Sequence, residues 1–233
     1  MNNKNIKAIV VGISDYSAYD NVPDLPYSGY DVLAIVHGLI NGLHIDGMNI
    51  WGKTRNSGTM TKESFLEGVK LFLSDTTPTD TVIFYFTGHG ATIYGKHYLA
   101  FSDGYLETQS VIDLFEQMNV RKRLLLLDCC MSGNFQIEKW TDSLADEGTA
   151  VLASSQPYEL AGYDKDITVS KFTLFLCVAM LNPNHIENGR LSLYWISCDV
   201  AYQAEQYNKT DPGIPQHPVL KSNLKEDIIF EVR

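Results

Sequence analysis

Residues 81–90 read TVIFYFTGHG, and residues 123–133 read RLLLLDCCMSG. Each stretch begins with a nearly continuous apolar run and ends in polar residues with glycine. Such runs are typical of parallel strands that are covered by helices on both faces of a sheet. In open α/β sheets, ligands bind beyond the carboxyl ends of the strands, so the residues that end these two stretches are the first candidates for function.

The rest of the chain alternates short β-branched runs with segments of helical period. We expect a three-layer α/β/α sandwich with a mostly parallel central sheet, formed by residues 1–233 as a single domain. The expected strands are residues 6–13, 49–51, 81–86, 123–128 and 149–153, and the expected helices are 28–43, a segment capped by Thr61, 108–118, 171–181 and 192–207.

Composition excludes several classes of protein. The 233 residues are 45% hydrophobic and 20% charged, which is typical of a folded chain rather than a disordered one. The formal charge of −10 argues against a nucleic-acid binder and favours basic ligands. The longest apolar run, residues 172–181, is about half of what a membrane-spanning helix needs. Two of the four cysteines are neighbours, which makes a poor disulfide framework, so we expect a cytoplasmic protein without membrane contact.

The two strand ends carry a base and a nucleophile. His89 lies between two glycines after the first run, and Cys129 and Cys130 follow the second. Neighbouring strands are about 4.8 Å apart, so an imidazole and a thiol could face one crevice. Taken singly, a buried cysteine is usually packing and a lone histidine usually structural. No metal-ligand spacing accompanies either cysteine, which argues against a thiolate-bound metal.

Side-chain alternation distinguishes the twin cysteines. In an extended strand, Asp128 and Cys130 point to one side and Cys129 points to the other. Cys130 therefore shares its side with a carboxylate. A cysteine that attacks an amide also needs N–H donors for the oxyanion, and the backbone amides of Gly90 and Cys130 are the natural pair.

These motifs resemble those of the caspase-like peptidases of family C14, which have the caspase-haemoglobinase fold. Thr87-Gly88-His89-Gly90 is similar to the Ser-Gly-His-Gly string of the metacaspase branch, and the Asp-Cys-Cys-Met-Ser-Gly of residues 128–133 is similar to its Asp-x-Cys-x-Ser-Gly. The resemblance implies that His89 and Cys130 form a Cys-His dyad in a thiol protease, with Cys130 as nucleophile and no third orienting residue. Further similar segments are residues 11–13, 28–31, 171–173 and 216–218.

The resemblance also implies a specificity. Animal caspases have glutamine two residues before the nucleophile and hold an acidic substrate residue, whereas this chain has Asp128 there. Metacaspases cleave after Arg or Lys, and the matching carboxylates are Asp31 and Asp128, with Ser28 and Thr87 as the pocket wall. A bidentate guanidinium–carboxylate pair favours Arg over Lys. The alternative for Asp31 is a solvated aspartate at a helix start, which is the less favoured interpretation of the two.

The resemblance also implies candidate modes of activation. The resemblance implies a prokaryotic member of the metacaspase branch. Relatives in this branch include calcium-activated enzymes and enzymes activated by cleavage after the cysteine, so calcium is a candidate activator, although no cofactor is needed for the chemistry. Lys139 is a candidate self-cleavage site, and an upstream protease or partner is a candidate activator. The scattered acidic residues Asp103, Glu107, Glu138 and Asp142 show no calcium-loop spacing.

Two alternatives to an endopeptidase remain open at this stage. The chain could be a catalytically silent caspase-like scaffold that binds a partner through the same cleft, although it has both residues of the dyad. It could also be an acyltransferase or hydrolase acting on a small amide with the same nucleophile. The predicted pair of carboxylates favours a protein or peptide substrate with exposed Arg or Lys.

Overall fold

The computed structural model describes residues 3–52, 58–135, 147–156, 159, 168–210 and 215–232. Its centre is a six-stranded sheet in the order β10-β8-β7-β3-β1-β2. All neighbours in this sheet are parallel except β10, which runs antiparallel to β8 at one edge. The strands are β1 (Ile6–Gly12), β2 (Ile50–Trp51), β3 (Thr81–Thr87), β7 (Lys122–Asp128), β8 (Gly148–Ala153) and β10 (Val219–Ser222).

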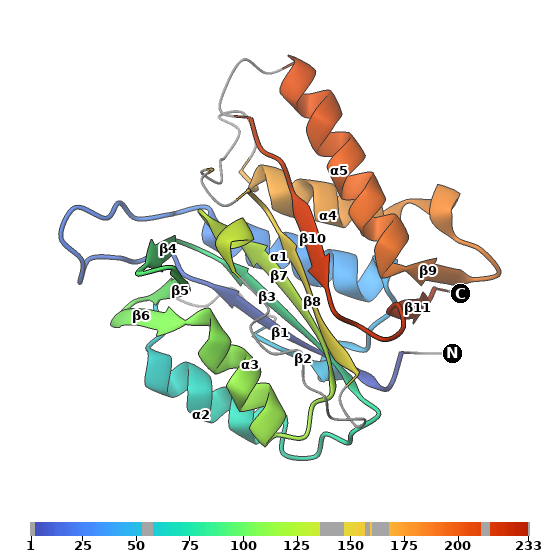
Figure 1. Cartoon of the computed structure of the whole chain (residues 1–233), viewed down its shortest axis with the longest axis horizontal. Helices are drawn as coiled ribbons and strands as arrows, with labels where there is room; N and C mark the ends of the chain where they lie inside the picture. Colours follow the sequence, from blue (N-terminus) through green and yellow to red (C-terminus); the bar gives the residue numbers. More distant parts are fainter. Residues whose placement is uncertain are drawn as a thin grey trace.

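Helices cover both faces of this sheet, as the expected sandwich requires (Figure 1). The helices α1 (Ser28–His37), α4 (Lys171–Leu181) and α5 (Leu193–Thr210) lie on one face, and α2 (Lys62–Phe72) and α3 (Thr108–Gln117) lie on the other. Short helical turns are η1 (Gly38–Gly42), η2 (Gly47–Asn49), η3 (Ser132–Asn134) and η4 (Pro183–His185). No helix among the described residues is long and apolar enough to span a membrane.

Strand β3 shows why the sheet needs both helical layers. Its seven residues are all buried, and the five apolar ones alternate between two hydrophobic clusters. Ile83 and Tyr85 pack with residues of α1 and α4, whereas Phe84 and Phe86 pack with residues of α2 and α3. A strand with two apolar faces cannot lie at a solvated surface, so its sequence requires the central position that it has.

Two small antiparallel sheets were not predicted from the sequence. One contains β4 (Gly90–Ile93), β5 (Lys96–Phe101) and β6 (Gly104–Glu107), and the other pairs β9 (Arg190–Ser192) with β11 (Ile229–Glu231). The turn between β4 and β5 has Tyr94 and Gly95 at φ 51° and 81°, which is the backbone of a tight hairpin turn. The first of these sheets begins at Gly90, so it extends directly from the histidine motif.

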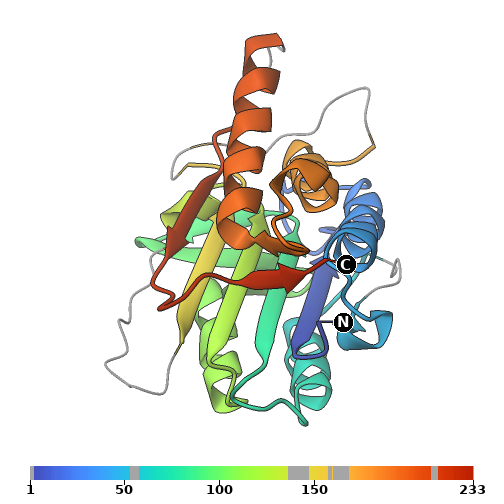
Figure 2. The same ribbon diagram turned by 90° about the vertical axis from the view of Figure 1, so that its right-hand side faces the viewer.

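The two ends of the described chain lie side by side (Figure 2). The Asn3 side chain accepts the Glu231 N–H at 3.0 Å and donates to the Glu231 carbonyl at 3.2 Å. The ends therefore meet near the start of β1, away from the carboxyl ends of the parallel strands.

Candidate active site

The histidine and cysteine motifs leave neighbouring strands at the same level. Strands β3 and β7 are parallel and in register, with Thr87 opposite Asp128. His89 and Cys130 each follow two residues later. A Cβ added to Gly90 would lie 2.6 Å from the Cys130 carbonyl oxygen, so the backbones of the two motifs are in close contact. The topology thus brings the two predicted motifs together.

The His89 ring is held by a backbone carbonyl. Its Nε2 lies 2.8 Å from the Pro23 carbonyl oxygen, in the loop between β1 and α1. A carbonyl can only accept a hydrogen bond, so Nε2 carries the proton and Nδ1 of the neutral ring is the free base. Our expectation of a dyad without an orienting group is therefore incomplete. Any residue type supplies a backbone carbonyl, which is why the sequence contains no signal for it.

Cys129 and Cys130 lie in different environments. Cys129 is fully buried, and burial raises the pKa of its thiol well above the usual value. Its sulfur lies 3.9 Å from Nε2 of the buried His97. Burial lowers the pKa of His97 to about 4, so this ring is neutral and no ion pair forms with the thiol. Cys130 is partly exposed, which favours it over Cys129 as the sulfur that a substrate can reach.

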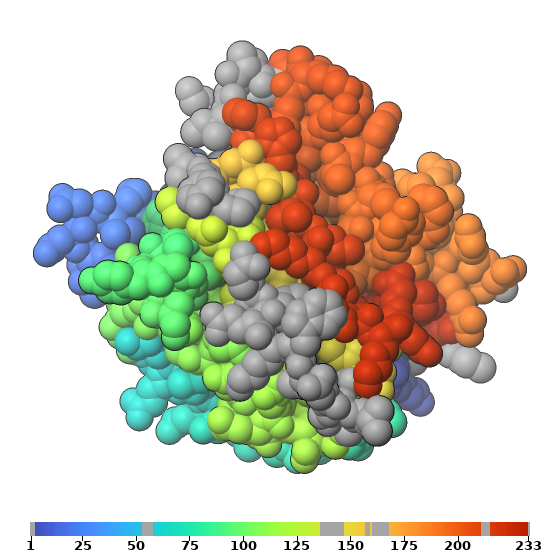
Figure 3. Space-filling model, in the orientation of Figure 1, coloured from blue at the N-terminus to red at the C-terminus, as the bar shows by residue number. Residues whose placement is uncertain are grey.

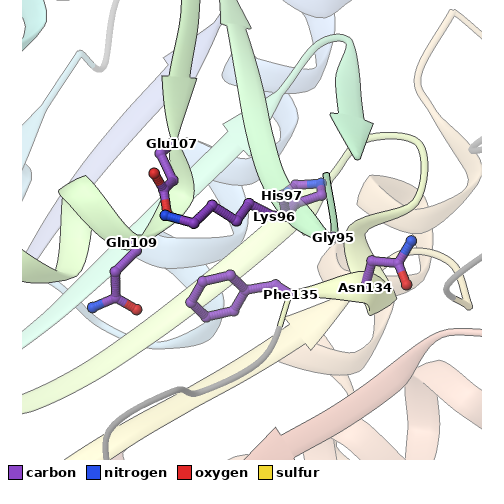
Figure 4. Close-up of a pocket in the computed structure, with 7 residues that line it drawn as sticks. All are labelled: Gly95, Lys96, His97, Glu107, Gln109, Asn134 and Phe135. Carbon is purple, nitrogen blue, oxygen red and sulfur yellow. The ribbon is translucent and has the colours of Figure 1, made fainter. Parts of the chain in front are cut away.

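His97 was not singled out from the sequence. Its Nδ1 is 2.8 Å from the Thr108 hydroxyl, and its Nε2 is 3.5 Å from the Cys130 carbonyl oxygen. His97 also lines a small pocket beside the β4–β5 hairpin. The ion pair of Lys96 and Glu107 forms part of the lining of this pocket (Figure 4). The cavity of about 10 Å³ has room for a water molecule at most. This pocket is therefore too small to be a substrate cleft.

The chain turns sharply after Cys130. Met131 has φ 57°, in the left-handed region that a residue with a side chain rarely adopts. Its N–H donates to the Glu159 carbonyl at 3.1 Å, and the Gly133 N–H donates to the Ser155 carbonyl at 2.9 Å. These bonds tie the segment after the cysteine to the chain that follows β8.

The two predicted specificity carboxylates converge on one residue, Ser170. Asp31 is fully buried, and its Oδ1 accepts the Ser170 N–H at 2.7 Å. Its Oδ2 accepts the Thr87 hydroxyl at 2.8 Å. Asp128 accepts hydrogen bonds from the hydroxyls of Ser170 and Thr173, the latter at 2.7 Å. The start of α4 thus links Asp31 with Asp128, while Thr87 bonds directly to Asp31, and the role of Ser170 and Thr173 was not predicted.

Burial governs the charge of Asp128. Desolvation raises its pKa to about 6, and the hydrogen bonds donated by Ser170 and Thr173 offset only part of this effect. The carboxyl group is therefore poised to change its charge just below neutral pH.

Two buried polar side chains at this end of the sheet have no hydrogen-bond partner among the described atoms. One is the hydroxyl of Ser28, a predicted wall residue one turn before Asp31. The other is the side-chain amide of Gln216, three residues before the β10 residue that pairs with the carboxyl end of β8. Buried polar groups are nearly always paired, so these two groups are available to an incoming polar ligand.

The regulatory residues are only partly described. Lys139, Glu138 and Asp142 lie outside the described residues. Asp103 accepts the Lys62 N–H at 2.9 Å, and Glu107 pairs with Lys96. In the part of the chain that the structure describes, no three His, Cys, Asp or Glu side chains come close enough to hold a metal ion. Calcium activation stays a prediction.

Comparison with known proteins agrees with this architecture. A family model described as the caspase domain, of peptidase family C14, matches residues 5–228. A search of curated proteins found no match. The matched range contains both strand-end motifs, and the members of this family are cysteine peptidases. The chain therefore belongs to the caspase domain family.

Proposed function

We propose that the protein is a cysteine endopeptidase that cleaves after Arg and, more slowly, after Lys. The observation that carries this proposal is the meeting of the two motifs at the ends of β3 and β7, with the Pro23 carbonyl leaving Nδ1 of His89 as the base. We further propose that residues 1–233 form one metacaspase-type domain of prokaryotic type that acts in the cytoplasm.

The chemistry follows the ordinary course of a thiol peptidase. His89 Nδ1 takes the proton of the Cys130 thiol, and the thiolate attacks the carbonyl carbon of the substrate. His89 then gives the proton to the leaving amine as the C–N bond breaks. Water, deprotonated by His89, hydrolyses the resulting thioester and releases the acid and the thiol.

The oxyanion would be held by the backbone N–H groups of Gly90 and Cys130. The His89 carbonyl accepts the Ala100 N–H from β5 at 3.0 Å. Because hydrogen bonds alternate along an antiparallel ladder, the Gly90 N–H then points away from β5. This direction leaves the Gly90 N–H without a partner in β5, which supports the proposed role.

Substrate specificity would come from Asp31 and Asp128. In the free protein their charges are compensated by donors from Ser170, Thr87 and Thr173. A guanidinium group offers five donors in a rigid fork, and it could replace some of these donors on both carboxylates. The unpartnered Ser28 hydroxyl would supply one further contact at the same place.

A panel of fluorogenic peptides that differ only in the residue before the cut tests this proposal. We expect Arg to exceed Lys, and Gln to be at least about 30-fold slower, because a buried charge pair contributes that much to recognition. Cys130→Ala should abolish cleavage, and the matched Cys129→Ala variant should retain it. Assays with calcium, with a chelator and after trial proteolysis cover the candidate modes of activation.

Two results would overturn the proposal. Preference for Asp before the cut would contradict the acidic pocket. If the wild-type protein cleaves no peptide under any of these conditions, the alternative of an inactive scaffold that binds a partner would be favoured instead. Self-cleavage at Lys139 is tested by Lys139→Ala, which should block any processing at this position.

A further inference from the structure

The loop between β1 and α1, residues 13–27, projects from the body of the molecule, yet it contains a fully buried tyrosine. Figures 1 and 3 show this loop in blue at one end of the molecule, beside the small sheet of β4, β5 and β6. Tyr16 has no exposed surface. A large side chain that is buried beneath a projecting loop must pack inward, and its neighbours there are the residues of the histidine motif.

Tyr16 contacts His89 in two independent ways. Its hydroxyl oxygen accepts the His89 backbone N–H at 2.8 Å. Its ring meets the imidazole edge to face, with 4.5 Å between centroids and an interplanar angle of 65°. Space around the contact is tight, since a Cβ added to Gly88 would lie 2.5 Å from the Tyr16 hydroxyl. The tyrosine therefore restrains both the backbone and the ring of His89.

The same loop also holds the other side of the imidazole. Pro23, whose carbonyl accepts from His89 Nε2, is followed by Asp24, whose Oδ1 accepts the Tyr16 N–H at 2.8 Å. The loop is closed by the Leu25 N–H, which donates to the Ser14 carbonyl at 2.9 Å. Tyr16 and Pro23 are thus parts of one closed loop that makes three contacts with His89: with its backbone N–H, with the face of its ring and with its Nε2.

We propose that Tyr16 is a positioning residue that fixes the orientation of the His89 ring, so that Nδ1 faces Cys130. This inference rests on the proposed dyad of His89 and Cys130. Holding two reacting groups in the productive geometry is worth large rate factors, and a displacement of about 1 Å can cost about 100-fold. Tyr16 does not touch the reacting atoms, so its contribution is geometric.

The phenol does not compete with His89 for protons. Burial raises the pKa of Tyr16 far above its usual value, and the nearby ionisable groups Cys129, Tyr19 and Tyr105 raise it further. Tyr16 therefore stays protonated at and above neutral pH, up to beyond the usual tyrosine pKa of about 10.

The test measures the reactivity of Cys130 directly, so no substrate is needed. The rate of alkylation of Cys130 by iodoacetamide is followed against pH, with mass spectrometry to separate this cysteine from the other three. In the wild type, the imidazole should make Cys130 react well below the ordinary thiol pKa of about 8.5. His89→Ala should return the profile to that ordinary value.

The tyrosine variants then test the inference. At about pH 6, Tyr16→Leu should lower the alkylation rate at least about 10-fold and move the profile towards that of His89→Ala. Tyr16→Phe keeps the ring contact and loses one hydrogen bond, so it should lower the rate about fivefold. Tyr19→Leu is the matched control, because Tyr19 lies in the same loop and its ring packs against the rings of Tyr16 and Tyr105. Its profile should equal that of the wild type.

The possible outcomes distinguish a failure of the positioning role of Tyr16 from a failure of the proposed dyad of His89 and Cys130. A folded Tyr16→Leu variant with the wild-type profile would overturn the positioning role and leave the dyad intact. If Tyr16→Leu does not fold, the Tyr16→Phe profile decides, and equality with the wild type would overturn the role. If wild type and His89→Ala give the same profile, the dyad itself is wrong.

Discussion

At the scale of single residues, Gly90 is where the histidine and cysteine motifs come closest. An added Cβ would lie 2.6 Å from the Cys130 carbonyl oxygen and 3.0 Å from the Cys129 sulfur. The first of these neighbours is backbone and cannot rotate away. Gly90 is therefore needed for the close approach of the two segments as well as for its proposed role in the oxyanion hole.

We predict that Gly90→Ala lowers kcat/KM by about 100- to 1,000-fold, as for loss of an oxyanion donor. Gly47→Ala is a matched control, because its added Cβ would meet only Ile40 at 3.8 Å. Steady-state kinetics and circular dichroism on both variants check the prediction. A Gly90→Ala protein with more than about a tenth of wild-type activity would contradict it.

The buried carboxyl of Asp128 predicts a pH-dependent stability. Its pKa is raised from 3.8 to about 6 in the folded state, so between these values the folded protein retains a proton that the unfolded chain has lost. The stability contributed by this group is therefore complete below the unfolded pKa and is lost as pH rises through about 6.

We predict that the free energy of unfolding of wild type, relative to Asp128→Asn, falls by about 2 kcal/mol between about pH 4.5 and about pH 7. Subtracting the variant removes the contribution of other carboxyl groups. Urea titrations of both proteins at the two pH values measure the difference. A constant difference would show that Asp128 is ionised throughout this range.

Cation binding should also depend on the charge of Asp128, but it should strengthen with rising pH, whereas stability falls. A guanidinium or amidinium group requires an ionised Asp128, so the Ki of benzamidine should improve as pH rises through about 6. Asp128→Asn should weaken binding and abolish this pH dependence. A Ki that does not change over this range would argue against Asp128 as a ligand for the cation.

At the scale of elements, the beginning of α4 connects the helix to both carboxylates. Ser170 is the N-cap, and its hydroxyl oxygen accepts the Thr173 N–H at 3.2 Å while its O–H donates to Asp128. By contrast, Thr61 caps α2 at an exposed position by accepting the Ser64 N–H at 3.2 Å. The two caps have the same geometry and differ in what else they bind.

We predict that Thr61→Ala lowers the free energy of unfolding by about 1 kcal/mol, the usual loss for an N-cap. Ser170→Ala should lower it by about 1–3 kcal/mol more, because it also removes a donor from the buried Asp128. Denaturant unfolding at neutral pH compares the two variants. Equal losses would indicate that the bond to Asp128 contributes nothing to stability.

At the scale of the whole molecule, the negative charge should attract basic substrates. The formal charge is −10, and salt screens such long-range attraction. We predict that kcat/KM for the Arg peptide falls several-fold between about 20 mM and about 500 mM salt, and that the Gln peptide changes less. Equal salt dependence for the two peptides would contradict electrostatic steering by the protein.

Most of the large elements could be predicted because their patterns are local. The expected strands 81–86 and 149–153 correspond to β3 and β8 within one residue at an end, and the expected helix 171–181 coincides with α4. The strands β4, β5, β6, β9, β10 and β11 were missed. All of them except the six-residue β5 have three or four residues, which is too short for a clear period, and antiparallel pairing with partner strands determines all six.

The sequence by itself determined the family features of this protein: apolar runs that must be buried on both faces, and His89 and Cys130 placed at the ends of two of them. Only the tertiary structure showed what surrounds these residues, namely the Pro23 carbonyl, Tyr16, and Ser170 between the two carboxylates. The physical reason is that burial patterns belong to a segment, whereas hydrogen bonds between residues 16 and 89, or 31 and 170, exist only after the sheet has assembled.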